Sequence, residues 1–177
     1  MIWVMRLLLA VMLLAAPMAA QAEVTDRSAA GFQIRHVLSI DAPQAQARAA
    51  VQEIGRWWSD DHTYSGKASN LSIDAAGCFC EKIPGGFVRH MTVVYSDPGA
   101  LKMFGGLGPL QTTGAAGHLG FEVAKAADPA KSVLTLTYNV GGYAKGGLAE
   151  TWAAPVDMVL GAQAGRLKKY IETGKPD

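Results

Sequence analysis

VDMVLGAQAGRLKKYIE, residues 156–172, places apolar side chains three and four positions apart, which is the spacing of one face of an α-helix. The stripe begins further upstream, so it predicts a terminal helix between Gly147 and Thr173, with Pro155 kinking the helix or starting its main segment. A helix with one apolar face must cover another apolar surface. The stripe consists of Leu148, Trp152, Val156, Val159, Leu160, Leu167, Tyr170 and Ile171.

The middle of the chain supplies that surface. From Leu71 onward, short alternating runs such as FVRHMTVVYS (residues 87–96) are separated by turn sequences, among them DPG at 97–99. This pattern predicts an antiparallel meander of about six strands. Upstream, FQIRHVLSI (32–40) alternates as one more strand, and the alanine-rich stretch 41–58 predicts one or two short helices.

Together these elements predict an α+β fold. We expect a curved antiparallel sheet of about seven strands wrapped around the long C-terminal helix, with two short helices after the first strand. The predicted domain spans residues 32–173, preceded by a linker at 23–31 and followed by a tail at 174–177. This length fits one domain with a sizeable core.

The first 22 residues, MIWVMRLLLAVMLLAAPMAAQA, have the features of a secretory signal peptide. Arg6 precedes an apolar run, and the segment ends in the small-residue motif AQA, so we expect cleavage before Glu23. The apolar run is short for a membrane span, which needs about 20 residues, and Pro17 interrupts it. The sequence therefore predicts a secreted protein of the bacterial periplasm, with no stable membrane anchor after cleavage.

The charge balance excludes a nucleic-acid-binding surface. The chain has 16 lysine and arginine residues against 15 aspartate and glutamate residues, and without Arg6 the remainder holds 15 of each. Neither the basic footprint of a nucleic-acid-binding protein nor a polybasic membrane patch is present. We therefore expect no nucleic-acid partner.

The order of these elements resembles that of the SRPBCC superfamily, also called START-like or Bet v 1-like. The segments that carry the resemblance are WWSDDHTYSG (57–66), GCFCE (77–81), VVYSDPGAL (93–101) and the terminal helix, and it covers roughly Phe32 to Glu172. Within the superfamily the chain is similar to the polyketide cyclase and chaperone-ATPase-activator-like branch. The resemblance implies a helix-grip fold with an apolar cavity between the sheet and the last helix. It implies a ligand such as a lipid, a sterol or a polyketide, and no shared catalytic signature.

The loop after the short helices is a candidate lip for this cavity. Trp57 and Trp58 are adjacent, so on a helix their side chains diverge by about 100°, and we expect one to pack in the core while the other overhangs the cavity mouth. Asp60, Asp61 and His62 offer metal-binding atoms, but three consecutive residues rarely converge on one point. Turn capping and solvated charge are the favoured interpretation.

Two cysteines, Cys78 and Cys80, lie on a predicted strand and share one face. Their Cα atoms are expected about 6.6 Å apart, near the upper end of the range that a disulfide tolerates. An oxidising compartment favours pairing, but free thiols are the expected state. Metal binding would need further ligands, with His90 and then His62 as candidates, and the spacing is not a zinc pattern. We expect no metal and no cofactor.

His90 is the candidate polar group of the cavity. Strand alternation places it on one face with Thr92 and Val94, while Met91 lies on the other face. A lone strand histidine is more often a hydrogen-bonded structural residue, and the alternative is an acid or base. The glycine-rich segment 141–147 is expected to form a flexible entrance loop, with Tyr143 touching what enters.

The sequence thus predicts an exported protein that holds a hydrophobic or amphipathic small molecule, without catalysis. The first alternative is a cavity enzyme of cyclase or hydrolase type, in which His90, assisted by Asp61 or Glu81, moves protons. A second alternative is a protein-interaction module whose cavity is filled by its own side chains. The expected ligand-binding residues are Trp58, Tyr64, Tyr138, Tyr143, Trp152 and Met158, with Cys78, Cys80 and His90 as polar spots.

Overall fold

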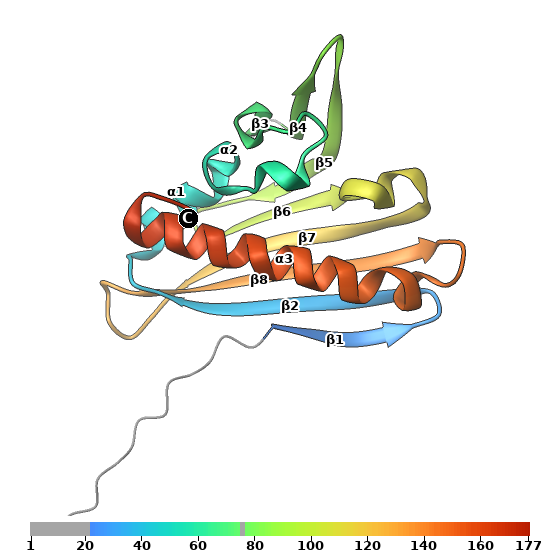
Figure 1. Ribbon diagram of the computed structural model, residues 1–177. Coiled ribbons are helices and arrows are strands. Elements are labelled where there is room, and N and C mark those ends of the chain that lie inside the picture. The colour runs from blue at the N-terminus through green and yellow to red at the C-terminus, as the bar shows by residue number, and fades with distance from the viewer. Residues whose placement is uncertain (1–21, 75–76) are drawn as a thin grey trace, which may run out of the picture.

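One antiparallel sheet of eight strands carries the other elements of the fold (Figure 1). The structure, a computed structural model, describes residues 22–74 and 77–177, so the predicted signal peptide lies outside it except for Ala22. The strand order is β1-β2-β8-β7-β6-β5-β4-β3. The strands are β1 Ala22–Ser28, β2 Gly31–Ile40, β3 Leu71–Asp74, β4 Cys78–Ile83, β5 Gly86–Ser96, β6 Ala100–Gly105, β7 Gly114–Lys125 and β8 Ser132–Tyr143.

The meander closes on the N-terminal strand. β3 to β8 follow one another along the sheet, which confirms the predicted meander of six strands, and β8 then pairs with β2 from Gly31↔Gly141 to Ile40↔Ser132. Burial alternates along β2, so that every second side chain from Phe32 to Ile40 is buried. The alternation read in the sequence therefore marks the face of the sheet that lies against the core.

Three helices follow the predicted positions. α1 (Gln44–Gln52) and α2 (Ile54–Trp57) come directly after β2, and α3 (Leu148–Thr173) crosses one face of the sheet (Figure 1). α3 continues through Pro155 as one element. Short 3-10 turns connect the remaining parts, and these are η1 (Asp60–His62), η2 (Ala68–Asn70) and η3 (Gly108–Thr112).

The apolar stripe of α3 meets the sheet as its spacing predicts. Leu160, Leu167 and Ile171 are buried, and the helix ends at Gly174, which adopts a left-handed conformation with φ of 77°. The α+β class, the long terminal helix and the two short helices after the strand at 31–40 are confirmed. Within the described residues, no helix is long and apolar enough to cross a membrane.

Two boundaries differ from the predictions. The segment predicted as a linker, 23–31, contributes most of β1, an eighth strand that pairs with β2. Its exposed polar residues show no apolar period, because an edge strand needs only a partner for its backbone. The entrance loop predicted at 141–147 begins later, because β8 continues to Tyr143 by pairing with β7 up to Gly114.

Candidate ligand-binding site

A cavity of about 350 Å³ opens between α3, the loop that follows α2, and the start of η3. Its walls are mostly apolar, and the polar side chains among them belong to Asp61, His62, Thr63 and Tyr64 in the loop after α2 and to His90 on β5. We refer to this space as the cavity. It is lined by Trp58, Asp61, His62, Thr63, Tyr64, Leu71, Phe79, His90, Leu107, Gly108, Pro109, Trp152, Pro155, Val156, Val159 and Leu160.

Four of the predicted ligand-binding residues lie in the cavity wall, namely Trp58, Tyr64, His90 and Trp152. Their part in binding stays a prediction. Trp58 packs against Phe79 with ring centroids 6.0 Å apart, and its indole N–H donates a hydrogen bond to the backbone oxygen of His62. This bond attaches the loop at residues 59–66, which we call the lip loop, to the tryptophan.

The two adjacent tryptophans lie in different places, Trp57 in the core and Trp58 in the cavity wall. Trp57 is fully buried in the core, where its indole N–H donates to the carbonyl oxygen of Ala50 at 3.0 Å and its ring meets Phe121 edge-on. Trp58 forms part of the cavity wall and is itself only 3% exposed. It does not overhang the mouth, because Phe79 and the lip loop enclose it.

Five other predicted ligand-binding residues lie outside the cavity. Tyr143 and Met158 are exposed on the surface, Tyr143 at the end of β8 and Met158 on the solvent side of α3. Tyr138 is fully buried in the core, where its hydroxyl accepts a hydrogen bond from the Leu107 amide and donates one to the Gly105 carbonyl. Burial raises the pKa of Tyr138 to about 12. The prediction of these three residues as cavity residues was wrong.

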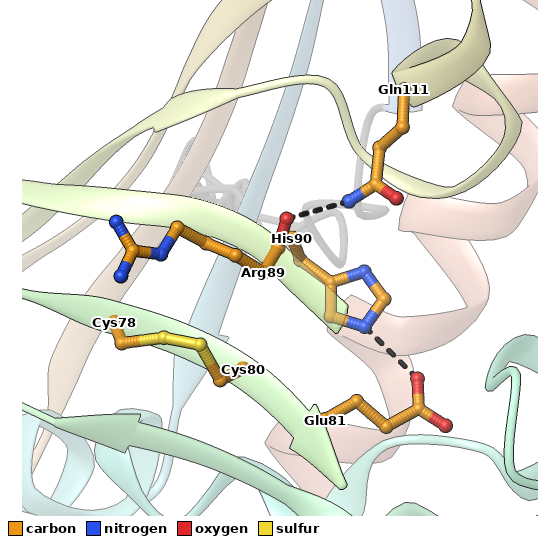
Figure 2. Close-up of a disulfide and its surroundings, with 6 residues drawn as sticks. All are labelled: Cys78, Cys80, Glu81, Arg89, His90 and Gln111. Atoms are coloured by element: carbon orange, nitrogen blue, oxygen red, sulfur yellow. Dashed lines mark hydrogen bonds and ion pairs between the residues drawn. A yellow bond between two sulfur atoms is a disulfide. The ribbon is translucent and has the colours of Figure 1, made fainter. Parts of the chain in front are cut away.

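Cys78 and Cys80 are the last two predicted ligand-binding residues outside the cavity. The predictions that they are free thiols and that they face the cavity were both wrong. They form a disulfide, not free thiols, with Cα atoms 5.4 Å apart (Figure 2). This separation is shorter than that in a flat strand, and it occurs where the register between β4 and β5 shifts. Neither sulfur faces the cavity, because Phe79 and Glu81 on the alternate positions of β4 are the buried residues.

Glu81 fixes the lip loop through hydrogen bonds to its backbone. Its carboxylate is fully buried and accepts hydrogen bonds from the backbone amides of Tyr64 and Ser65. Its Oε2 also lies 3.0 Å from Nε2 of His90 (Figure 2). Burial alone would raise the pKa of Glu81, but the hydrogen bonds from Ser65, Tyr64 and His90 outweigh burial and hold the pKa below its usual range.

His90 reaches the cavity through a β-bulge. Phe79 pairs with Met91 and Cys80 with Arg89, so His90 is the extra residue on β5. The bulge places His90 and Met91, which are neighbours in sequence, both in buried positions, and the predicted strict alternation around His90 was wrong. The imidazole lies between the rings of Phe79 and Tyr64, at centroid distances of 4.8 and 5.8 Å.

The acidic cluster of the lip loop takes the structural role that was favoured for it. Asp60 accepts a hydrogen bond from the Ala68 amide at 2.6 Å, while Asp61 and His62 are exposed at the cavity rim. Within the described residues, 22–74 and 77–177, no group of three or more histidine, cysteine, aspartate or glutamate side chains is placed to hold a metal.

Some residues that line the cavity were not predicted from the sequence. Val156, Val159 and Leu160 belong to the stripe of α3, so the helical period already contained the signal that placed them on the inner face. Leu107 and Pro109 carried no signal, because they enter the wall through the connection between β6 and β7. Glu81 was named only as an alternative to Asp61, and it is Glu81 that contacts His90.

A second buried histidine, His36, contacts a carboxylate of α3. It lies on β2, 4% exposed, with Nε2 3.1 Å from Asp157 of α3. Burial lowers the pKa of His36 and of His90 below 6.5, although Asp157 and Glu81 oppose this shift.

We therefore expect the free energy of unfolding to fall as the pH is lowered below 6.5. The unfolded chain binds protons there before the folded protein does, and the slope reaches at most about 1.4 kcal/mol per pH unit for each histidine. Urea unfolding at pH 7.5, 6.5 and 5.5 measures the slope, and His90→Phe is expected to reduce it by about half. Glu81 does not contribute in this range, because its pKa lies below 4.5. Stability that rises on acidification would contradict the assignment of both histidines as neutral.

Comparison with known proteins identifies the fold. No protein-family model matches the sequence, and no curated protein matches it. The crystal structure of CalU16 from Micromonospora echinospora is 13% identical, with 90% of this chain and 88% of CalU16 covered and a TM-score of 0.57. The Aha1 dimer from Colwellia psychrerythraea is 15% identical (81% and 98% covered, TM-score 0.53), and Ara h 8.0201 is 11% identical (78% and 96% covered, TM-score 0.51). At these identities the likeness establishes the fold alone, and it is the helix-grip fold that the resemblance to the SRPBCC superfamily implied.

Proposed function

We propose that this chain is an exported protein that binds one hydrophobic or amphipathic small molecule, of lipid, isoprenoid or polyketide-like character, in the cavity. The observation that carries the proposal is the composition of the cavity wall, in which aliphatic and aromatic side chains of α3, β4 and the lip loop surround a few polar groups. Pockets for small molecules have this composition, and a volume of about 350 Å³ lies at the small end of their range.

The energetics of such a cavity favour an occupant. Apolar side chains that line the cavity lack the packed neighbours of core side chains, and an apolar ligand supplies those dispersion contacts. A cavity of about 350 Å³ counts against the alternative of a protein-interaction module, because that alternative requires a cavity filled by the chain's own side chains.

Export is proposed from the first 22 residues. The pairing of Cys78 with Cys80 supports this part of the proposal, since disulfides form and persist in oxidising compartments such as the periplasm. The proposed location and the proposed ligand class are independent of one another, and one experiment addresses both.

Native mass spectrometry of the protein purified from its own secretory compartment tests the proposal. We expect a chain that begins at Glu23 and carries one noncovalently bound molecule, which solvent extraction then releases for identification. A mass that retains residues 1–22 would contradict export. A bare chain that also fails to take up any apolar probe added to it would contradict ligand binding.

A cavity enzyme of cyclase or hydrolase type is the second candidate. The observation that favours it is the contact between His90 and Glu81 at the cavity wall, because a neutral imidazole oriented by a carboxylate is suited to proton transfer. Incubation of the extracted ligand with the protein separates the two candidates. Chemical conversion that His90→Phe abolishes would establish the enzyme, and recovery of unchanged ligand supports binding without catalysis.

A further inference from the structure

One nitrogen of His90 has no hydrogen-bond partner among residues 22–74 and 77–177. Nε2 is occupied by Glu81, whereas Nδ1 is buried and makes no hydrogen bond to any residue that the structure describes. The side chain of His90 is 4% exposed, and the residue lines the cavity. A buried polar atom without a partner is unfavourable, and in a residue that lines a cavity a ligand can supply the missing hydrogen bond.

The partner of Nε2 determines what Nδ1 can do. The Glu81 carboxylate accepts hydrogen bonds from two backbone amides and has no proton to donate, so Nε2 of His90 must carry the hydrogen in their shared bond. Burial among Phe79, Tyr64 and the cavity wall lowers the pKa of His90 and so favours the neutral ring. Nδ1 therefore presents a lone pair and accepts a hydrogen bond.

We propose that the ligand is a neutral molecule with a hydroxyl group, an alcohol, a phenol or an enol on an apolar skeleton, and that this hydroxyl donates a hydrogen bond to Nδ1 of His90. The inference rests on the proposed function and specifies the ligand class of the same cavity. In this arrangement Glu81 is a positioning residue, which sets the tautomer of His90 and does not touch the ligand.

The same groups disfavour a carboxylate ligand such as a fatty acid. A carboxylate has no hydrogen to offer Nδ1, and it would come close to the negative charges of Glu81 and of Asp61 at the rim. Among the residues that the structure describes, no lysine or arginine lines the cavity to neutralise an anion. An anion without a charged partner is strongly disfavoured in an apolar site.

Three probes that share one ring system test the inference. 2-Naphthol donates a hydrogen bond, 2-methoxynaphthalene has the same ring system with one added methyl group and cannot donate, and 2-naphthoate is an anion at pH 7. Isothermal titration of the wild-type protein is expected to show 2-naphthol binding about tenfold or more tighter than 2-methoxynaphthalene, with 2-naphthoate the weakest.

The variant His90→Phe removes the acceptor and keeps an aromatic ring in the wall. We expect it to bind 2-naphthol and 2-methoxynaphthalene with equal affinity. His118→Phe is the matched control, because His118 is exposed on β7 and does not line the cavity, and it is expected to retain the wild-type preference.

The outcomes distinguish this inference from the proposed function. Equal affinity of the wild-type protein for 2-naphthol and 2-methoxynaphthalene, or tightest binding of 2-naphthoate, would overturn the inference and leave an apolar binding site in place. Failure of all three probes to bind would count against the binding function itself. The tautomer is measured without any variant, by long-range ¹H–¹⁵N NMR of the imidazole, and a hydrogen found on Nδ1 of His90 would also overturn the inference.

Discussion

Replacement of Glu81 by alanine is expected to lower the free energy of unfolding by about 3–5 kcal/mol. The carboxylate accepts hydrogen bonds from the amides of Tyr64 and Ser65 and from Nε2 of His90. Alanine leaves these three donors without the buried carboxylate that accepts from them, and each unsatisfied donor costs about 1–3 kcal/mol before the loop relaxes. Chemical denaturation of wild-type protein and variant measures the difference.

A matched carboxylate on the surface provides the control. Glu122 pairs with Lys102 at 2.8 Å, but both side chains are about half exposed, so Glu122→Ala is expected to cost less than about 1 kcal/mol. Glu81→Ala should also detach the lip loop and weaken binding of any cavity ligand, whereas Glu122→Ala should not. Equal and small effects of the two substitutions would show that Glu81 does not hold the loop.

The substitution Val159→Trp is expected to weaken ligand binding by about 100-fold or more, because the indole occupies the space that the ligand needs. Val159 lies on α3 and lines the cavity. The fold is expected to persist, since the added ring enters a space that no core side chain fills. Titration with 2-naphthol measures the affinity, and circular dichroism verifies the fold.

The neighbouring residue on the helix is the control for this substitution. Met158 is 71% exposed and does not line the cavity, so Met158→Trp adds the same indole one position away and is expected to leave the affinity unchanged. If Met158→Trp abolished binding and Val159→Trp did not, the ligand would lie on the outer side of α3 and the cavity would not be the binding site.

The local spacing of apolar residues predicts the helices and strands of this protein. The stripe from Leu148 to Ile171 predicts α3 because burial of one helical face repeats every three to four residues. The alternating runs from Leu71 onward predict the strands for the same reason, with a period of two, and turn residues such as those at 97–99 separate them. These signals are contained in neighbouring residues, so no knowledge of the tertiary structure is needed to read them.

The candidate site could be predicted only in part. Trp58, Tyr64, His90 and Trp152 lie in the cavity wall, and each is an aromatic residue or histidine on an element next to the predicted cavity. Their part in ligand binding stays a prediction. Tyr138 has the same chemical character, but its hydroxyl is satisfied by the Gly105–Leu107 segment in the core. Residue type alone does not separate these two cases.

The tertiary structure decided the features that depend on distant parts of the chain. The bulge at His90 depends on how β5 is aligned with β4, and it overrides the alternation that the strand's own residues predict. The contact of Glu81 with Tyr64 and Ser65 joins residues on separate elements. β1 forms by pairing with the edge of β2. The sequence by itself determined which elements form, because their periods are local. Strand register and loop packing decided which polar groups meet at the cavity, because these depend on pairings that no local period encodes.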